Sequence, residues 1–180
     1  MQAERVILVD PHDEAIGTAE KLEAHVTGAL HRAFSVFILN HRGEILMQRR
    51  AAGKYHGAGL WSNSCCGHPR PGEEITAAAT RRLNEEMGFT CGLRRLFSFT
   101  YRAEMEDGLW EHEIDHVLIG HHDAEPRPDP AEVAEWRWID PDSLRLEMQR
   151  EPENFTPWLR PALEGLIPHL SLESGKQSAP

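Results

Sequence analysis

Arginines and carboxylates recur four residues apart in the segment 81–86. On a helix, Arg81 lies beside Glu85 and Arg82 lies beside Glu86, because side chains four residues apart share one face. Carboxylates placed in this way can hold a hard divalent cation, and such an ion, with few protein ligands, can bridge to a diphosphate. The alternative is a solvated, salt-bridged helix face, which is the better interpretation of an isolated Glu-Glu pair. The residues around this segment distinguish a cation site from a salt-bridged helix face.

The residues around this segment predict the elements that position it. Apolar side chains from Ile75 to Leu83 recur at helical spacing, two glutamates stand in the first turn, and Gly88 follows as a stop, so residues 73–88 predict a helix. The preceding residues 53–72 contain five glycines and two prolines, too much backbone freedom for a regular element. We therefore predict a long loop before the helix, and long loops often carry function.

Short apolar runs elsewhere predict the strands of a sheet. Residues 40–43 form a turn between two of these runs, which predicts a hairpin. With no internal repeat and no second core, we expect an α/β (α+β) fold in one domain, a mixed central sheet packed between helices. The predicted strands cover residues 5–9, 34–39, 45–49, 97–101, 114–119 and 133–139.

Two further helices are predicted near the end of the chain. The Asp-Pro pair at 140–141 starts one that reaches about Arg150, since proline suits the first helical position. The Thr-Pro pair at 156–157 starts a last helix that reaches about Leu166. Pro161 should distort the first turns of that last helix.

Composition and charge exclude several classes of protein. The chain has 180 residues, 40% apolar and 27% charged, which is typical of one globular domain with a real core. Its 19 Lys and Arg against 29 Asp and Glu give a formal charge of −10, so we expect neither nucleic acid nor an anionic membrane as a partner. An acidic start and the lack of an 18-residue apolar stretch predict neither secretion nor membrane insertion. Cys65, Cys66 and Cys91 fit reduced thiols in the cytoplasm.

The spacing from Gly67 to Phe89 resembles the Nudix box. That pattern runs Gly, five residues, Glu, seven residues, Arg-Glu-apolar-any-Glu-Glu-any-Gly-apolar, and one fixed position differs: the Glu after the first Arg is replaced by Arg82. In the hydrolytic members of the superfamily that Glu helps to bind the ion that activates water for phosphate cleavage. A cation there would repel a metal and attract a diphosphate oxygen, which favours a site that binds a pyrophosphate without cutting it.

Further motifs are similar to those of the type 1 isopentenyl-diphosphate delta-isomerase family. The similarity runs nearly end to end, through EKLEAH, HRAFSVFILN, QRRAAGK, NSCCGHP, RRLNEEMG, TYRA, WEHE and FTPW. It implies a Nudix fold, a metal-dependent interconversion of isopentenyl and dimethylallyl diphosphates, and a role in isoprenoid precursor supply. Residues 1–170 would form this domain, with the box at 67–89, and residues 171–180 a flexible C-terminal tail.

The family resemblance implies three catalytic residues. Cys66 matches the catalytic cysteine, whose side chain faces the carbon that gains or loses a proton, and Glu113 matches the acid or base on the opposite side. Tyr101 matches a residue thought to pass the proton alongside Glu113. The alternatives are a small buried hydrophobe for Cys66 and a half-buried strand aromatic for Tyr101. Cys65 occupies a variable place in the motif, so we expect it to be structural.

The resemblance also implies two metal sites. Glu111 and Glu113 are two residues apart, so on a strand both carboxylates point to one face. His25 and His31 cannot share a helix face and converge only if the chain turns between them, which Gly28 permits. The second ion, expected to be Mg²⁺, is held by Glu86 against the substrate diphosphate. The first site has nitrogen and oxygen ligands that suit Mn²⁺, Mg²⁺ or Zn²⁺, and these are His25, His31, His68, Glu111 and Glu113.

The remaining implied site residues would bind the substrate. Trp158 matches an aromatic over the hydrocarbon end, where an indole face stabilises a tertiary carbocation, and its helix would form part of a lid. The alternative is a core anchor of the last helix. The cations implied around the diphosphate are Lys21, Arg50, Lys54 and Arg82.

We therefore expect a cytoplasmic, monomeric isomerase that acts on a small isoprenyl diphosphate. Two other functions stay open at this point. One is a Nudix pyrophosphohydrolase acting on a nucleoside diphosphate derivative, which the box itself suggests. The other is a catalytically silent metal-binding module.

Overall fold

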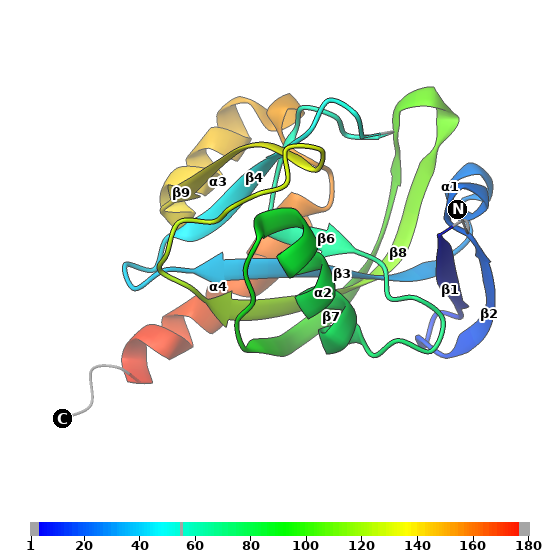
Figure 1. The fold of residues 1–180 in the computed structure, drawn as a ribbon, viewed down its shortest axis with the longest axis horizontal. Coiled ribbons are helices and arrows are strands. Elements are labelled where there is room, and N and C mark those ends of the chain that lie inside the picture. The colour runs from blue at the N-terminus through cyan, green and yellow to red at the C-terminus, as the bar shows by residue number, and fades with distance from the viewer. Residues whose placement is uncertain (1–3, 55, 177–180) are drawn as a thin grey trace.

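A mixed sheet forms the centre of the molecule (Figure 1). The computed structural model describes residues 4–54 and 56–176, and within these ranges the sheet has nine strands. The strands are β1 (Arg5–Val9), β2 (Ala15–Glu20), β3 (His31–Leu39), β4 (Ile45–Arg50), β5 (Trp61–Ser62), β6 (Cys65–Gly67), β7 (Leu93–Glu104), β8 (Trp110–His121) and β9 (Val133–Ile139). The helices are α1 (Lys21–Thr27), α2 (Ile75–Met87), α3 (Pro141–Arg150) and α4 (Leu159–Lys176), with short 3₁₀ turns η1 (Glu106–Gly108) and η2 (Pro152–Asn154).

Strand β3 organises the sheet. It pairs in parallel with β8 along its whole length and antiparallel with β6, β1 and β4. Strand β7 extends the sheet as an antiparallel partner of β8, and β9 pairs antiparallel with β4. Because β3 lies between β6 and β8, it brings residues near position 66 and residues near position 113 into one sheet, on either side of β3.

Helices cover both faces of the sheet, α2 on one face and α3 with α4 on the other (Figure 1). Side chains alternate between the faces along β3. Phe34 and Val36 pack with Leu83 of α2, whereas Phe37 packs with Leu159 of α4 and its neighbours. Fully burying a side chain of this size stabilises the fold by roughly 1.5–3 kcal/mol, so these two layers fix the sheet that carries the site.

The predicted boundaries of α2 and α3 rest on local capping, and both helices form as expected. The Glu74 carboxylate accepts hydrogen bonds from the backbone N–H groups of Thr76 and Ala77 and so begins α2. Asp140 begins α3 in the same way. Gly88 ends α2 with φ of 75°, where an added Cβ would lie 2.3 Å from the Arg127 carbonyl oxygen, so this position requires glycine.

The loop and hairpin predictions were partly wrong. The segment 53–72 contains the short strands β5 and β6, because non-local pairing with β4 and β3 overrides the local freedom of its glycines. The predicted hairpin keeps its turn, but β3 and β4 share a single register pair, Leu39 with Ile45, before they separate to pair with β8 and β9. Strand β2 and helix α1 were not predicted.

The last helix also differs from its prediction. It begins at Leu159, two residues after Pro157, and continues to Lys176. Pro161 lies in its first turn, where a backbone N–H has no intrahelical partner, so it fits without the expected distortion. The helix thus enters the segment 171–180 expected as a flexible tail, whose last four residues lie outside the described residues. No helix among the described residues is long and apolar enough to span a membrane.

Candidate active site

One cavity opens beside β3 and collects most of the residues singled out from the sequence. His25 and His31 are the exceptions, since they lie buried behind Glu111 and Glu113 and complete the wall. The other predicted residues that line it are Lys21, Arg50, Lys54, Cys66, His68, Arg82, Glu86, Tyr101, Glu111, Glu113 and Trp158.

Strand pairing brings the polar side chains to one face of the sheet. Glu113 pairs with His31 on β3 and with Tyr101 on β7, and Cys66 pairs with Ser35 on β3. Because His31 and Ser35 are four residues apart on one strand, they and their partners share a face. Cys66 and Glu113 therefore approach the cavity from positions roughly 13 Å apart along β3, which leaves room for a small ligand between them.

Three imidazoles and two carboxylates converge at one end of the cavity. His68 Nε2 lies 2.6 Å from Glu113 Oε1, and His31 Nε2 lies 3.3 Å from the same oxygen. His25 Nε2 lies 3.2 Å from Glu111 Oε2. All five residues are buried, and one ligand atom from each lies within 4.8 Å of the others. The predicted group of five is thus assembled in space.

The outer ring nitrogens of two of these histidines are tied to the backbone. His25 Nδ1 donates to the Lys21 carbonyl at 2.6 Å, and His31 Nδ1 donates to the Ala29 carbonyl at 2.8 Å. Each bond leaves Nε2 as the basic nitrogen that points at the cluster, as in histidines that bind metals. The turn that brings the two rings together is made at Gly28, with φ of 67°, as expected from the sequence.

The protonation states of His68 and Glu113 suit a divalent cation. Burial lowers the pKa of His68 to about 4, so its imidazole is neutral at neutral pH. Burial alone would raise the pKa of Glu113, but the adjacent imidazoles of His31 and His68 hold it well below its usual range. Neutral imidazoles and ionised carboxylates are the forms that bind a metal, so these residues fit one.

Cys66 and Tyr101 lie in the same cavity as protonated groups. Burial raises the pKa of the Cys66 thiol to about 12, even though Arg50 Nη1 lies 3.8 Å from its sulfur. The Tyr101 hydroxyl donates a hydrogen bond to Glu113 Oε2 at 2.5 Å. Burial raises the pKa of Tyr101 well above the usual value. Cys65 points the other way into the core under α2, and Cys65, Cys66 and Cys91 are free thiols.

Arg82 of α2 lines the cavity and is paired with two carboxylates of the same helix. Arg82 lies 2.5 Å from Glu86 and 2.7 Å from Glu85, the i,i+4 and i,i+3 pairs of the helix. Glu86 also accepts a hydrogen bond from Gln48 at 2.7 Å. This carboxylate lies outside the group of five, so the two predicted metal positions are separate in space.

Trp158 closes the cavity from the side of α4. It precedes that helix instead of lying within it, and it is 3% exposed. Its indole N–H is shared between Ser62 Oγ at 3.1 Å and Asn63 Oδ1 at 3.3 Å, and Arg50 lies 5.5 Å from the ring centre. The ring is therefore fixed as part of the cavity wall.

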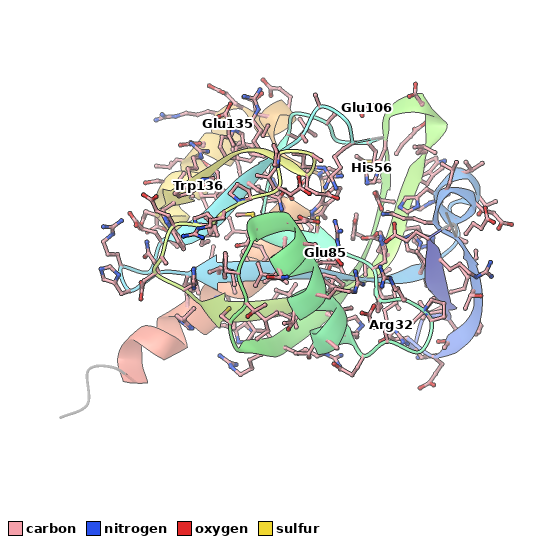
Figure 2. All side chains as sticks on the ribbon, viewed as in Figure 1. Arg32, His56, Glu85, Glu106, Glu135 and Trp136 are labelled. Carbon is pink, nitrogen blue, oxygen red and sulfur yellow. The ribbon has the colours of Figure 1, made fainter. Side chains whose placement is uncertain are left out.

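Asp115 and His56 also line the cavity and were missed in the sequence. Asp115 is buried and accepts a hydrogen bond from Ser35 at 2.7 Å, and burial together with the charge of Glu113 raises its pKa. Strand alternation from Glu113 could have found it. His56, labelled in Figure 2, lies 2.5 Å from Glu111 Oε1. It stands in a glycine-rich loop, where no spacing rule points to it.

The fold and the box helix define the class, a Nudix domain, and residues 29–159 match that domain family. Solved structures agree at the level of the fold. A Deinococcus radiodurans protein, DR0079, has a TM-score of 0.68 at 22% identity, covering 82% of this chain and 90% of its own. A MutT protein from Methanosarcina mazei has a TM-score of 0.64 at 21% identity, covering 81% and 95%.

Relatives with higher sequence identity show which family within the Nudix class the chain resembles. Isopentenyl-diphosphate delta-isomerase 2 of Aromatoleum aromaticum is 48% identical over 176 residues, which is 98% of this chain and 93% of that protein. The isopentenyl-diphosphate delta-isomerase of Burkholderia multivorans is 52% identical over 161 residues, 89% and 92% of the two chains. The chain belongs to the isopentenyl-diphosphate delta-isomerase family.

Proposed function

We propose that the protein interconverts isopentenyl and dimethylallyl diphosphates by adding a proton to one carbon of an allylic system and removing a proton from another. One observation carries this proposal: Cys66 and Glu113 line the same cavity from separate strands, with cations and an indole in its wall. Adding a proton to the terminal alkene carbon creates a tertiary cation, and loss of a proton from the neighbouring methylene restores a double bond. No phosphate bond breaks in either direction.

Cys66 and Glu113 are the proposed proton carriers, with Tyr101 beside Glu113. A thiol with a pKa of about 12 keeps its proton at neutral pH and can donate it, whereas an ionised carboxylate can accept one. The roles exchange in the reverse reaction. The hydroxyl of Tyr101, 2.5 Å from the carboxylate, orients it and offers a path for its proton.

We assign the group of five to one divalent ion, Mn²⁺, Mg²⁺ or Zn²⁺, and Glu86 to a second, Mg²⁺, beside the diphosphate. Bound at the first site, an ion supplies positive charge that orients Glu113 and tunes its basicity. The residues of that first site are His25, His31, His68, Glu111 and Glu113.

Substrate binding is assigned to both ends of the cavity. Trp158 excludes water from the hydrocarbon end and stabilises the cation there by roughly 0.5–2 kcal/mol. The diphosphate would be bound by Lys21, Arg50, Lys54 and Arg82. We further propose a cytoplasmic monomer that acts on a small molecule and binds neither nucleic acid nor membranes, in keeping with a net charge of −10.

The Nudix fold also suggests an alternative function, the hydrolysis of a diphosphate. Against it stands Arg82, which replaces a box carboxylate and forms an ion pair with Glu86. We expect little or no phosphate release from nucleoside diphosphate derivatives.

The deciding experiment is turnover of isopentenyl diphosphate in D₂O. Deuterium should appear in dimethylallyl diphosphate, and Cys66→Ala should lower the rate by about 10²-fold or more, the usual contribution of a positioned acid or base. Cys65→Ala is the matched control, since that thiol faces the core, and it should retain deuterium incorporation. A Cys66→Ala protein with full turnover would overturn the assignment.

A further inference from the structure

We propose that Glu132, in the loop before β9, is a positioning residue that aims two of the cavity cations at the substrate diphosphate. This inference rests on the proposed function, which assigns Lys54 and Arg82 to the diphosphate. Neither the box spacing nor the family motifs quoted above include Glu132.

A single carboxylate oxygen of Glu132 joins cations from two different parts of the fold. Its Oε2 accepts a hydrogen bond from Lys54 Nζ, in the turn after β4, and lies 3.3 Å from Arg82 Nη2 on α2. The three side chains are 25%, 19% and 18% exposed respectively, so solvent screens these pairs less than pairs on the open surface.

Backbone hydrogen bonds link Glu132 to the two segments that carry Lys54 and Arg82. Its carbonyl accepts from Ala51 N at 3.0 Å, and Ala51 in turn accepts from Lys54 N at 3.2 Å. Its N–H donates to Asp129, whose own N–H donates to the Glu86 carbonyl at the end of α2. The Glu132 carboxylate therefore lies on a loop that is hydrogen-bonded both to the turn that carries Lys54 and to α2, which carries Arg82.

A register shift in the neighbouring strands fits this role. The pairing of β4 with β9 slips between Arg49 and Arg50, so that Arg50 lies opposite Val133, the residue after Glu132. Such bulges re-aim side chains. Here Arg50, Lys54 and Arg82 all come to line the cavity, with Glu132 placed between the last two.

A negative charge beside a diphosphate site has two opposing effects. It repels the ligand, but it also holds together two cations that would otherwise turn toward other acids, since Arg82 already lies 2.5 Å from Glu86. If repulsion dominates, removing the charge tightens binding. If positioning dominates, removal weakens binding, because flexible cations must be ordered by the ligand at a cost in free energy. We infer that positioning dominates.

The test is the affinity of Glu132→Gln for isopentenyl diphosphate and for inorganic pyrophosphate with Mg²⁺, measured by titration calorimetry. We expect the Kd and KM to rise roughly tenfold, which corresponds to about 1.4 kcal/mol, while kcat falls by less than about threefold. Glu132→Asp should recover part of the loss. The matched control is Glu135→Gln, at a residue labelled in Figure 2, since Glu135 pairs at 2.9 Å with Arg49, a cation that does not line the cavity.

A double-mutant cycle separates positioning from a general loss of structure. In a Lys54→Met background, Glu132→Gln should raise the Kd by clearly less than in the wild-type background, because the carboxylate acts partly through that lysine. Equal effects in both backgrounds, or an unchanged or lower Kd for Glu132→Gln, would overturn the inference alone. A wild-type protein that binds neither diphosphate would overturn the proposed function, and the inference with it.

Discussion

Cys66 combines access to a polar cavity with a raised pKa. Reactive thiols usually carry lowered pKa values beside cations, and here Arg50 is such a neighbour. Burial nevertheless dominates, so that the thiol keeps its proton. A sulfur that holds its proton at neutral pH is a poor nucleophile, and it enters the proposed reaction in the thiol form.

This gives a prediction for the alkylation of Cys66 by iodoacetamide. With a pKa of about 12, the thiolate makes up about one part in ten thousand at pH 8, so alkylation should be slow and its rate should rise about tenfold per pH unit. The rate is followed between pH 7 and 9 by mass spectrometry that localises the label. Glutathione under the same conditions is the control, and a rate for Cys66 that levels off below pH 8 would contradict the assignment of an acid.

At the scale of elements, the start of the box helix depends on an ion pair. Arg81 donates two hydrogen bonds to Glu73, at 2.8 and 2.9 Å, and Arg70 N donates a third at 2.9 Å. The bonds from Arg81 are the largest cause of the lowered pKa of Glu73. The pair fixes the loop that leads from Gly67 into α2, and thereby the position of the cations on that helix.

We expect Glu73→Gln to lower stability at pH 7 by about 1 kcal/mol, or roughly 2–4 °C in Tm. Because the folded pKa of Glu73 is depressed, its contribution is complete above the ordinary glutamate value and is lost as the pH falls through the lower folded value. The Tm difference between the two proteins should therefore shrink in acid. Thermal melts from pH 7 to 3 check this, and a difference that is constant over this range would contradict the role of the pair.

The elements that the sequence predicted well are those specified by nearby residues. Helices α2 and α3 have their own caps, and β9 has its own alternation, so their bounds follow from local physics. Strand β6 could not be found, because three residues become a strand only by pairing with β3, thirty residues earlier. The same limit applies to the candidate site, where family motifs supplied the group of five but not His56 or Glu132.

At the scale of the whole molecule, the sheet assembles a site from distant parts of the chain. The cluster takes His25 from α1, His31 from β3, His68 from after β6, and Glu111 and Glu113 from β8. Two carboxylates are buried together in this cluster, and a divalent ion would supply counter-charge for them. Binding of that ion should therefore stabilise the whole fold.

Metal removal should accordingly lower the thermal stability. At a free metal concentration of about 100 times the Kd, the bound state gains about 2.7 kcal/mol, or roughly 5–10 °C in Tm, and a chelator should reverse it. Calorimetry with Mg²⁺, Mn²⁺ or Zn²⁺ added back one at a time measures the shift. His31→Asn should abolish it, whereas His41→Asn should keep it, because His41 is exposed and does not line the cavity. A wild-type Tm that is insensitive to both metal and chelator would contradict the metal site.

The most direct measurement is a crystal structure of the Cys66→Ala protein with a divalent metal and isopentenyl diphosphate bound. The account predicts that the five-carbon chain lies between position 66 and the Glu113 carboxylate, under the Trp158 indole, with the intact diphosphate against Arg50, Lys54 and Arg82. A hydrocarbon chain bound away from that gap, or a diphosphate seated on the imidazole cluster, would contradict it.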